Sequence, residues 1–394
     1  MMNLKALILL TAGHFVTDIN TGALPAYLPF IKESLTLSYT MTAFIVLIFN
    51  VTSSVIQPVF GYFSDRWSAK WLLPTGCVIA SLGLGFLGIG PSYGWVLLFA
   101  ALGGLGQGSY HPEAFKTVNS LSGEKKASGI SFFLVGGSLG LSVGPLLATL
   151  FFKYLGLKGS LLFLPPGIAM AIIFLTTPSW RAKTSPPPHK SKTSLPPGSS
   201  RPGLFPMTLL LLTVILRSTT QLSIKTFVPL YFIHSFQKDP LIVGKFLSTY
   251  LLAGTFGSLV GGVLADRYGY KRTVILSLGL TPFLLYLFFY TTGITSLVLL
   301  GIAGLVLSSS TAITMAMGQS YMPRNLGMAS GLILGLAMGI GGVGTMLLGW
   351  VADQWGVIFS LRIVFILPLL SLLPFFYLPS PTLPNIRKPP QPHL

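Results

Sequence analysis

The chain has 394 residues, of which 52% are hydrophobic and only 8% are charged, and its formal net charge is +17. Soluble globular domains carry about 25% charged residues, so this composition excludes an ordinary soluble protein and indicates an integral membrane protein. Apolar runs of about 20 residues, the length of a membrane-spanning helix, recur along the chain. Because these runs are continuous, they favour helices over a β-barrel.

The first predicted span covers about residues 5–31 and is read as an uncleaved helix. His14 and Asp18 stand on one face of it, between Thr11 and Thr21. An acid inside a membrane span is costly unless it is paired or faces water, so it marks a candidate functional site. We predict that Asp18 binds a coupling proton with His14 beside it; the alternative is a structural pair that joins neighbouring helices.

The other spans of the first half are predicted at about 40–63, 70–90, 93–115, 126–152 and 157–178. In the second span, Asn50 and Gln57 belong to a polar stripe that is expected to line a substrate cavity, with polar helix packing as the alternative. In the fourth span, His111 and Glu113 are two residues apart and would face opposite ways in a regular helix. Pro112 between them is predicted to kink the chain and bring both to a proton-relay site; the alternative is a helix end in water.

A segment rich in Pro, Ser and Lys, residues 179–204, predicts a flexible linker between two six-helix halves, residues 1–178 and 205–378. The second half has predicted spans at about 205–235, 242–265, 270–292, 295–320, 327–351 and 356–378. A Pro-rich tail, residues 379–394, follows. The predicted fold class is therefore an all-α integral membrane protein with twelve transmembrane helices.

In the seventh span, Arg217, Gln221 and Lys225 are four residues apart and share one helix face. Arginine suits forked contacts to phosphate or phosphonate, so we predict that this face binds the substrate. The two cations need an anion, either Asp18 or Glu113 from the other half, or an anionic substrate. The alternative for Lys225 is that its side chain reaches the outer membrane surface.

Lys and Arg are distributed unevenly between the two predicted sides of the membrane. With the N-terminus inside, the ratio is 17 inside to 6 outside. Cytoplasmic loops collect such residues, so both termini and the linker are expected in the cytoplasm. The high positive charge therefore does not require a nucleic-acid partner.

The two halves repeat short motifs at a constant offset. GYFSDRWSAK at 61–70 and GVLADRYGYK at 262–271 share Gly, Asp, Arg and Lys at identical spacing. Parallel six-helix repeats are typical of transporters with a site between the halves.

The repeated loop resembles the signature motif of the major facilitator superfamily. The resemblance implies the twelve-helix fold of that family and a gating role for the motif, in which Asp65 acts as a cytoplasmic latch between the halves. The residues concerned are Gly61, Asp65, Arg66, Lys70, Asp266, Arg267 and Lys271.

The fifth span contains a row of glycines at intervals of four, followed by a proline. Such a row makes a smooth helix face that a neighbour can approach closely, and simple packing is one interpretation. The row also resembles the Gly-Pro motif of the superfamily's antiporters. Its members are Gly136, Gly140, Gly144 and Pro145.

Three segments, GHFVTDINTGALPAYLPF, FNVTSSVIQPVFGYFSDR and GLGQGSYHPEAF, are similar to the fosmidomycin-resistance exporters within the superfamily. The resemblance implies efflux of a small antibiotic, driven by proton influx, across a bacterial plasma membrane (the inner membrane in a Gram-negative cell). The predicted function is a proton-coupled antiporter for a small polar or anionic antibiotic.

Two alternatives remain open: a proton-coupled importer of an organophosphate or organic anion, and a membrane sensor or scaffold without transport. An enzyme is not indicated, because the sequence has no P-loop, no Cys/His metal cluster and no nucleophile elbow. No cofactor or metal is expected. The expected partners are a small-molecule substrate, protons and the lipid bilayer, and the protein is expected to be monomeric.

Overall fold

The structure is a computed structural model, and the residues it describes form helices and no strands. It describes residues 3–57, 59–60, 69–122, 126–177, 180, 204–236, 239–322, 329 and 331–379. The loop motif at Gly61, Asp65 and Arg66, the side chain of Asp266, most of the linker and the tail from residue 380 onward lie outside this part of the chain.

The first half contains six α-helices, with a π-helical turn (η1) after the second and a 3₁₀ segment (η2) before the last. They are α1 (Leu4–Ser34), α2 (Tyr39–Asn50), η1 (Val51–Val55), α4 (Leu72–Leu87), α5 (Tyr93–Leu121), α6 (Lys126–Leu155), η2 (Gly156–Phe163) and α7 (Leu164–Thr176).

The second half also contains six α-helices within the described residues, with a π-helical segment (η4) before the fifth. They are α8 (Leu204–Phe236), α9 (Pro240–Tyr268), α10 (Tyr270–Tyr290), α11 (Gly293–Tyr321), η4 (Gly331–Leu336), α13 (Ala337–Trp355) and α14 (Val357–Phe376). Each half therefore reproduces the predicted order of helices. By length and composition alone, seven helical segments of the described chain are able to cross a membrane, so the count of twelve spans stays a prediction.

Local sequence explains where several of these helices begin and end. Ser38 accepts the backbone N–H of Met41 at 3.1 Å and caps α2. Asp239 caps α9 in the same way, and Pro240 occupies the first turn, where its missing N–H costs nothing. Gly356, at φ +84°, ends α13 and allows the chain to turn directly into α14.

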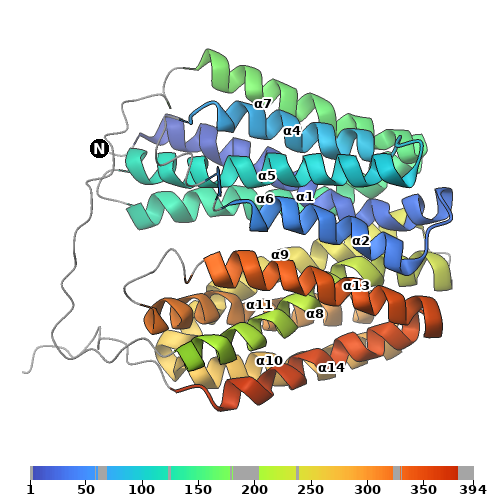
Figure 1. Ribbon diagram of the computed structural model, residues 1–394, viewed down its shortest axis with the longest axis vertical. Helices are drawn as coiled ribbons and strands as arrows, with labels where there is room; N and C mark the ends of the chain where they lie inside the picture. Colours follow the sequence, from blue (N-terminus) through green and yellow to red (C-terminus); the bar gives the residue numbers. More distant parts are fainter. Residues whose placement is uncertain are drawn as a thin grey trace, which may run out of the picture.

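The two halves lie one above the other in Figure 1, with α1–α7 in one layer and α8–α14 in the other. Two helix pairs make the principal contacts between the layers, α6 with α9 and α2 with α13. Helix α1 begins, and helices α7 and α14 end, at one end of the bundle (Figure 1), which we call the terminal end. Helices α2, α9 and α14 begin at the opposite end.

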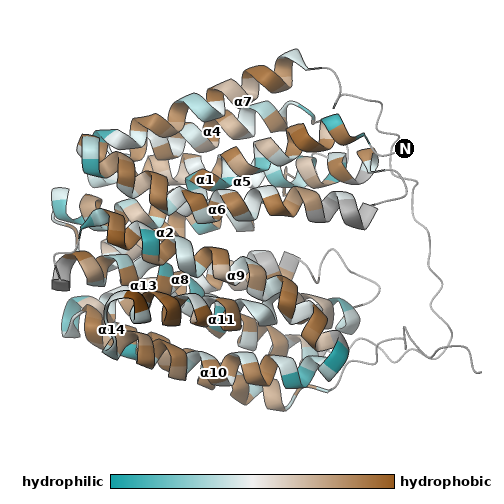
Figure 2. Cartoon of the chain, turned by 180° about the vertical axis from the view of Figure 1, so that it is seen from behind, coloured by the Kyte–Doolittle hydropathy of each residue, from teal (hydrophilic) through white to brown (hydrophobic). Residues whose placement is uncertain are grey.

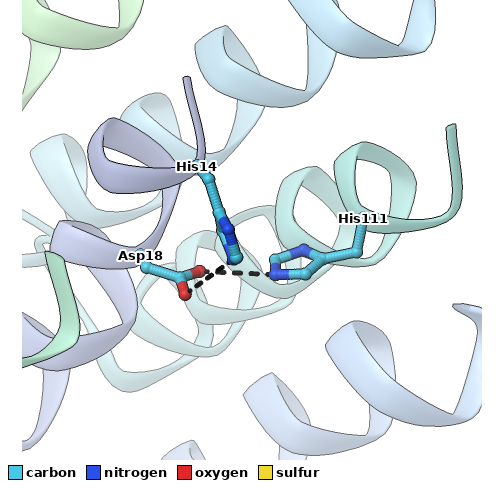
Figure 3. Close-up of side chains that lie close together, drawn as sticks. All are labelled: His14, Asp18 and His111. Atoms are coloured by element: carbon cyan, nitrogen blue, oxygen red, sulfur yellow. Dashed lines mark ion pairs between the residues drawn. The ribbon is translucent and has the colours of Figure 1, made fainter. Parts of the chain in front are cut away.

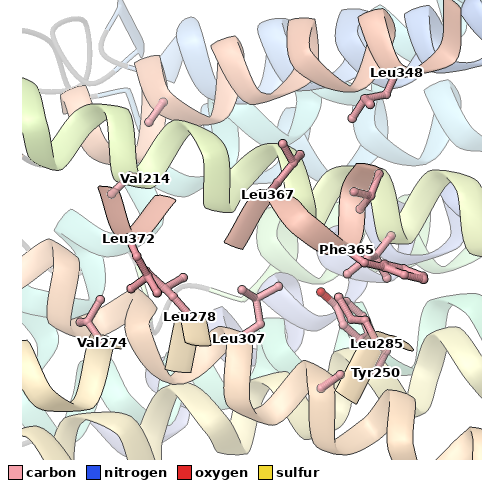
Figure 4. Packing of buried hydrophobic residues seen from close by; sticks show 14 of the residues in the cluster. Val214, Tyr250, Val274, Leu278, Leu285, Leu307, Leu348, Phe365, Leu367 and Leu372 are labelled. Atoms are coloured by element: carbon pink, nitrogen blue, oxygen red, sulfur yellow. The ribbon is translucent and has the colours of Figure 1, made fainter. Parts of the chain in front are cut away.

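Apolar side chains both fill the interior and cover the outside of the bundle. Leu278, Leu307 and Leu372 are among the buried residues of the second half (Figure 4). Much of the helical ribbon in Figure 2 has the brown colour of hydrophobic residues, and among them Val263 and Phe283 are more than half exposed. A surface of this kind would be unstable in water and fits a lipid environment.

Candidate functional site

An acid and two histidines converge inside the first half (Figure 3). On α1, His14 Nε2 lies 3.2 Å from Asp18 Oδ2, one helical turn away. From α5, His111 Nε2 lies 3.5 Å from the other carboxylate oxygen of Asp18. His14 and Asp18 are only 3% and 4% exposed. The structure thus brings together three of the four residues for which a proton-coupling role was predicted, and we call them the acid–histidine cluster.

Backbone carbonyls fix the tautomers of both histidines. His14 Nδ1 lies 2.9 Å from the carbonyl of Phe133, and His111 Nδ1 lies 2.9 Å from the carbonyl of Gln107. A carbonyl oxygen only accepts hydrogen bonds, so each Nδ1 carries a hydrogen. If both rings are neutral, the Nε2 lone pair of each one faces the Asp18 carboxylate. Both groups accept hydrogen bonds, so no hydrogen bond forms between them and their electron pairs repel. A proton, or another small cation, placed between these atoms resolves this conflict. One ring nitrogen of each histidine and one carboxylate oxygen of Asp18, the atoms that could bind it, all lie within 4.8 Å of one another.

Gln107 is a member of this site that the sequence reasoning missed. Its Nε2 donates to Asp18 Oδ1 at 2.7 Å, and its Oε1 accepts the hydroxyl hydrogen of Thr21. It also supplies the carbonyl that holds His111, one turn further along α5. The signal was present in the sequence as a polar residue four positions before His111, but only the packing of α5 against α1 reveals its partner.

Glu113 lies apart from the cluster, which corrects the expected relay. Helix α5 continues without a break through Pro112, so residues two positions apart face different ways. Glu113 is 2% exposed, lies 3.9 Å from Lys116 Nζ and accepts from Thr117 at 3.4 Å. A proline is tolerated inside a membrane helix when neighbouring groups satisfy the freed carbonyl.

The predicted basic face of α8 lines a cavity of about 280 Å³ between the halves, and Arg217, Gln221 and Lys225 all belong to it. Arg217 Nη1 donates to Thr311 Oγ1, and Gln221 Nε2 donates to Ser308 Oγ at 3.3 Å. The remaining lining residues come chiefly from α9 and α11, and α6 contributes Ser138.

No carboxylate in the described part of the chain lies within 4.0 Å of Arg217 or Lys225. The expected contact of Arg217 with Asp18 or Glu113 is therefore absent. Arg217 Nε and Tyr250 Oη are buried without a hydrogen-bond partner. Because an unpaired buried cation is costly, a cavity with these groups favours an anion.

The polar stripe of the second span does not reach this cavity. Asn50 is buried and donates to the carbonyl of Val46 in its own helix at 2.8 Å. Neither Asn50 nor Gln57 lines the cavity, so the expected substrate role of these two residues lacks support in this conformation.

Helix α6 connects the cluster and the cavity through two consecutive residues. A side-chain carbon placed on Gly137 would collide with His14 Nε2 and would lie 2.6 Å from Asp18 Oδ2. The next residue, Ser138, lines the cavity on the other side. A movement of α6 at these residues therefore changes the packing against the acid–histidine cluster and the lining of the cavity together.

The glycine row of α6 packs against α1. A side chain on Gly136, Gly140 or Gly144 would collide with α1 carbonyls, those of Thr11, Phe15 and Ile19 respectively. Helix α9 also approaches α6 closely at the following residue, because a Cβ on Gly244 would lie 2.9 Å from the carbonyl of Pro145. The row thus serves close packing within the half, and its end joins the halves; its role in antiport stays a prediction.

At the end opposite the termini, two polar contacts that the sequence reasoning missed join the halves. Asp353 of α13 accepts the backbone N–H groups of Tyr39 and Thr40 at 2.5 and 2.9 Å. Lys153 of α6 lies 3.0 Å from Asp239 at the start of α9. These acids follow or precede predicted spans, and nothing in the one-dimensional pattern pairs them across the halves.

Few of the predicted gating residues can be placed. Lys271, in the second copy of the loop motif, donates to the carbonyl of Phe376 at the end of α14, at 3.4 Å. The guanidinium of Arg267 lies 5.5 Å from the ring centre of Tyr268. Lys70 precedes α4. The predicted latch at Asp65 lies outside the described residues.

Comparison with known proteins places this arrangement in a family. Residues 10–332 and, in an overlapping match, 209–393 fit the Major Facilitator Superfamily. The fosmidomycin resistance protein of Escherichia coli (strain K12) is 30% identical over 93% of this chain and 91% of its own length. The hexuronate transporter of Bacillus subtilis (strain 168) is 25% identical over 90% of this chain and 89% of its own length.

Solved structures share the fold. A bacterial homolog of the human lysosomal transporter Spinster, in an inward-facing and occupied conformation, superimposes with a TM-score of 0.75 at 14% identity, covering 94% of this chain and 95% of that one. The nucleoside transporter NupG superimposes with a TM-score of 0.72 at 17% identity, covering 94% and 97%. Given the match along its sequence and its two layers of six helices, the chain belongs to the Major Facilitator Superfamily and is a membrane transporter.

Proposed function

We propose that the protein is a proton-coupled antiporter that exports a small anionic antibiotic, such as a phosphonate, from a bacterial cell. The observation that carries the proposal is the cavity with Arg217, which is buried, and Lys225, which is half-buried; neither cation has a carboxylate partner among the described residues. A phosphonate supplies the missing charge, and the Arg217 guanidinium suits its oxygens. The similarity to a fosmidomycin resistance protein supports the same substrate class.

The acid–histidine cluster supplies the proton side of the exchange. It needs a proton or another cation between Asp18 and the two Nε2 atoms, and it is almost sealed from solvent. Because α6 contacts both the cluster and the cavity, we infer that proton loading changes the packing of α6 and so the affinity of the cavity for the anion. A coupling through α6 thus takes the place of the expected direct contact between Asp18 and Arg217.

Alternating access completes the mechanism. The contacts of Asp353 with α2 and of Lys153 with Asp239 hold the halves together at the end opposite the termini. We place that end outside the cell, because the sequence predicts that most Lys and Arg lie on the same side of the membrane as the termini. The outward-facing state then requires that these contacts break.

The test is fosmidomycin-induced proton release from inside-out membrane vesicles. Wild-type vesicles should release protons when the drug is added, and Asp18→Asn should abolish this release while the protein still folds. Glu33→Gln is the matched control, because Glu33 is an exposed acid on the same helix. Normal coupling in Asp18→Asn would overturn the proton role of the cluster.

A second candidate is an importer of an organic anion, and the same cationic cavity favours it together with the similarity to a hexuronate transporter. Labelled glucuronate and glycerol phosphate should distinguish the two. Accumulation of either against its gradient, without resistance to fosmidomycin on expression, would support import and contradict export.

A further inference from the structure

A second cavity, of about 400 Å³, lies in the second half at the end opposite the termini. It is formed by the adjoining ends of α8, α9, α10 and α11 and shares no residue with the cavity around Arg217. Its size falls within the range of about 300–1,000 Å³ that is typical of sites for small organic molecules.

The walls of this cavity are aromatic and deeply buried. Phe232, Phe246 and Phe288 are each less than 9% exposed. The ring centres of Phe232 and Phe246 lie 4.6 Å apart, and those of Phe232 and Phe288 lie 6.2 Å apart. These rings form a continuous apolar surface rather than scattered contacts.

Two of the hydroxyl groups at the cavity already donate to backbone carbonyls. Ser296 donates to the carbonyl of Phe288 at 3.2 Å, and Thr291 donates to the carbonyl of Leu287 at 2.8 Å. Water is stable in a cavity only when it finds two to four polar partners there. The walls therefore favour an apolar occupant over water.

The mouth combines an apolar rim with one cation. Tyr290 and Ile294 line the cavity and are both 71% exposed, although they occupy the ends of membrane helices. This exposure opens the cavity toward the outer lipid boundary, where aromatic residues commonly gather. Lys245 is exposed and lines the same cavity, and no carboxylate of the described residues lies within 4.0 Å of it.

We propose that this cavity binds an anionic amphiphile. Its acyl chain lies among Phe232, Phe246 and Phe288, and its carboxylate or phosphate head contacts Lys245. The apolar walls account for the chain, and the cation at the mouth accounts for the charge. The site shares no residue with the cavity around Arg217. The proposal for this site therefore does not depend on the proposed transport activity.

The test uses the purified full-length protein in an uncharged detergent, with dansylaminoundecanoic acid as the fluorescent probe. Saturable binding is expected. Leu297→Trp, which fills the cavity, should weaken binding at least tenfold. Leu287→Trp is the control, since Leu287 is exposed on α10 and does not line the cavity. Equal binding to wild type and to a correctly folded Leu297→Trp variant would overturn the proposal.

Lys245→Gln tests the charge without disturbing the core, because this side chain is exposed. It should weaken binding of the probe about two- to fivefold, as for an exposed ion pair, and leave an uncharged dansyl amide unaffected. Displacement of the probe by phosphatidylglycerol but not by lauric acid identifies a membrane lipid as the occupant, and the reverse identifies a free fatty acid. Equal displacement by phosphatidylcholine would refute the anionic head.

Discussion

The carboxylate of Asp353 accepts the backbone N–H of Thr40 at 2.9 Å, although the two residues belong to opposite halves of the bundle. It also accepts the N–H of Tyr39 at 2.5 Å and the hydroxyl hydrogen of Thr40. The first N–H groups of a helix have no partner within it, and an anion there is stabilised by the helix dipole. An acid at the end of α13 thus completes the first turn of α2.

Asp353→Ala should favour the state in which this end is open. The lost contact is worth about 1–2 kcal/mol, which corresponds to about a five- to thirtyfold shift in population. Spin labels on Tyr154→Cys and Phe359→Cys, in a Cys77→Ser background, report the separation of the halves at this end. The distance distribution should shift to longer values in Asp353→Ala and stay unchanged in Glu33→Gln. An unchanged distribution in both would show that Asp353 does not hold the halves together.

The contact between Lys153 and Asp239 should not respond to pH in the range of transport. The backbone N–H of Leu241, and then the Lys153 ammonium, hold the pKa of Asp239 below its ordinary value of 3.8. A group whose pKa is lowered in the folded state contributes above its ordinary pKa, and the contribution is lost as the pH falls through the lower value. The contact is therefore complete at any pH from about 5 to 8.

Lys153→Gln should consequently change the rate of efflux at every pH by the same factor. The pH at which fosmidomycin efflux from vesicles is half-maximal, measured between about pH 5.5 and 8, should be the same for this variant as for the wild type. A displaced midpoint would mean that this pair takes part in proton coupling.

Sequence reasoning predicted the helices well because hydrophobic length is a local property. Predicted spans at about 5–31 and 270–292 correspond to α1 (Leu4–Ser34) and α10 (Tyr270–Tyr290). The placement of His14 beside Asp18 also followed from the helical period alone.

Contacts between helices were harder to predict, because the period of one helix does not say which neighbour it faces. Gln107 and His111 meet Asp18 only through the packing of α5 against α1. Glu113 was assigned to the cluster on the expectation that Pro112 would kink the chain, whereas the α-helix is continuous through that residue. Asp353 appeared to be an ordinary acid at a span end, since its partners lie more than 300 positions away.

Gly137→Ala should impair transport by displacing the acid–histidine cluster. The new methyl group would collide with His14 Nε2, and accommodating an added carbon in a packed core costs about 1–3 kcal/mol. Gly279→Ala is the matched control, because no atom lies within 4 Å of a Cβ at that position on α10. The temperature of thermal unfolding and the drug-induced proton release should both be lower in Gly137→Ala than in the wild type. Both should be unchanged in Gly279→Ala. Wild-type proton release in Gly137→Ala would separate α6 from proton handling.

Arg217→Lys should weaken phosphonate binding, and Arg217→Gln should weaken it further. Lysine keeps the charge but loses the forked geometry, whereas glutamine loses both. Hydrogen bonds to charged groups contribute about 1.5–3 kcal/mol, so we expect about tenfold weaker binding for lysine and about a hundredfold for glutamine. Calorimetric titration of fosmidomycin into the purified protein measures both. Arg362→Gln is the control, because Arg362 is exposed and does not line the cavity. If all three variants bound equally, the substrate would have to lie elsewhere than in the cavity around Arg217.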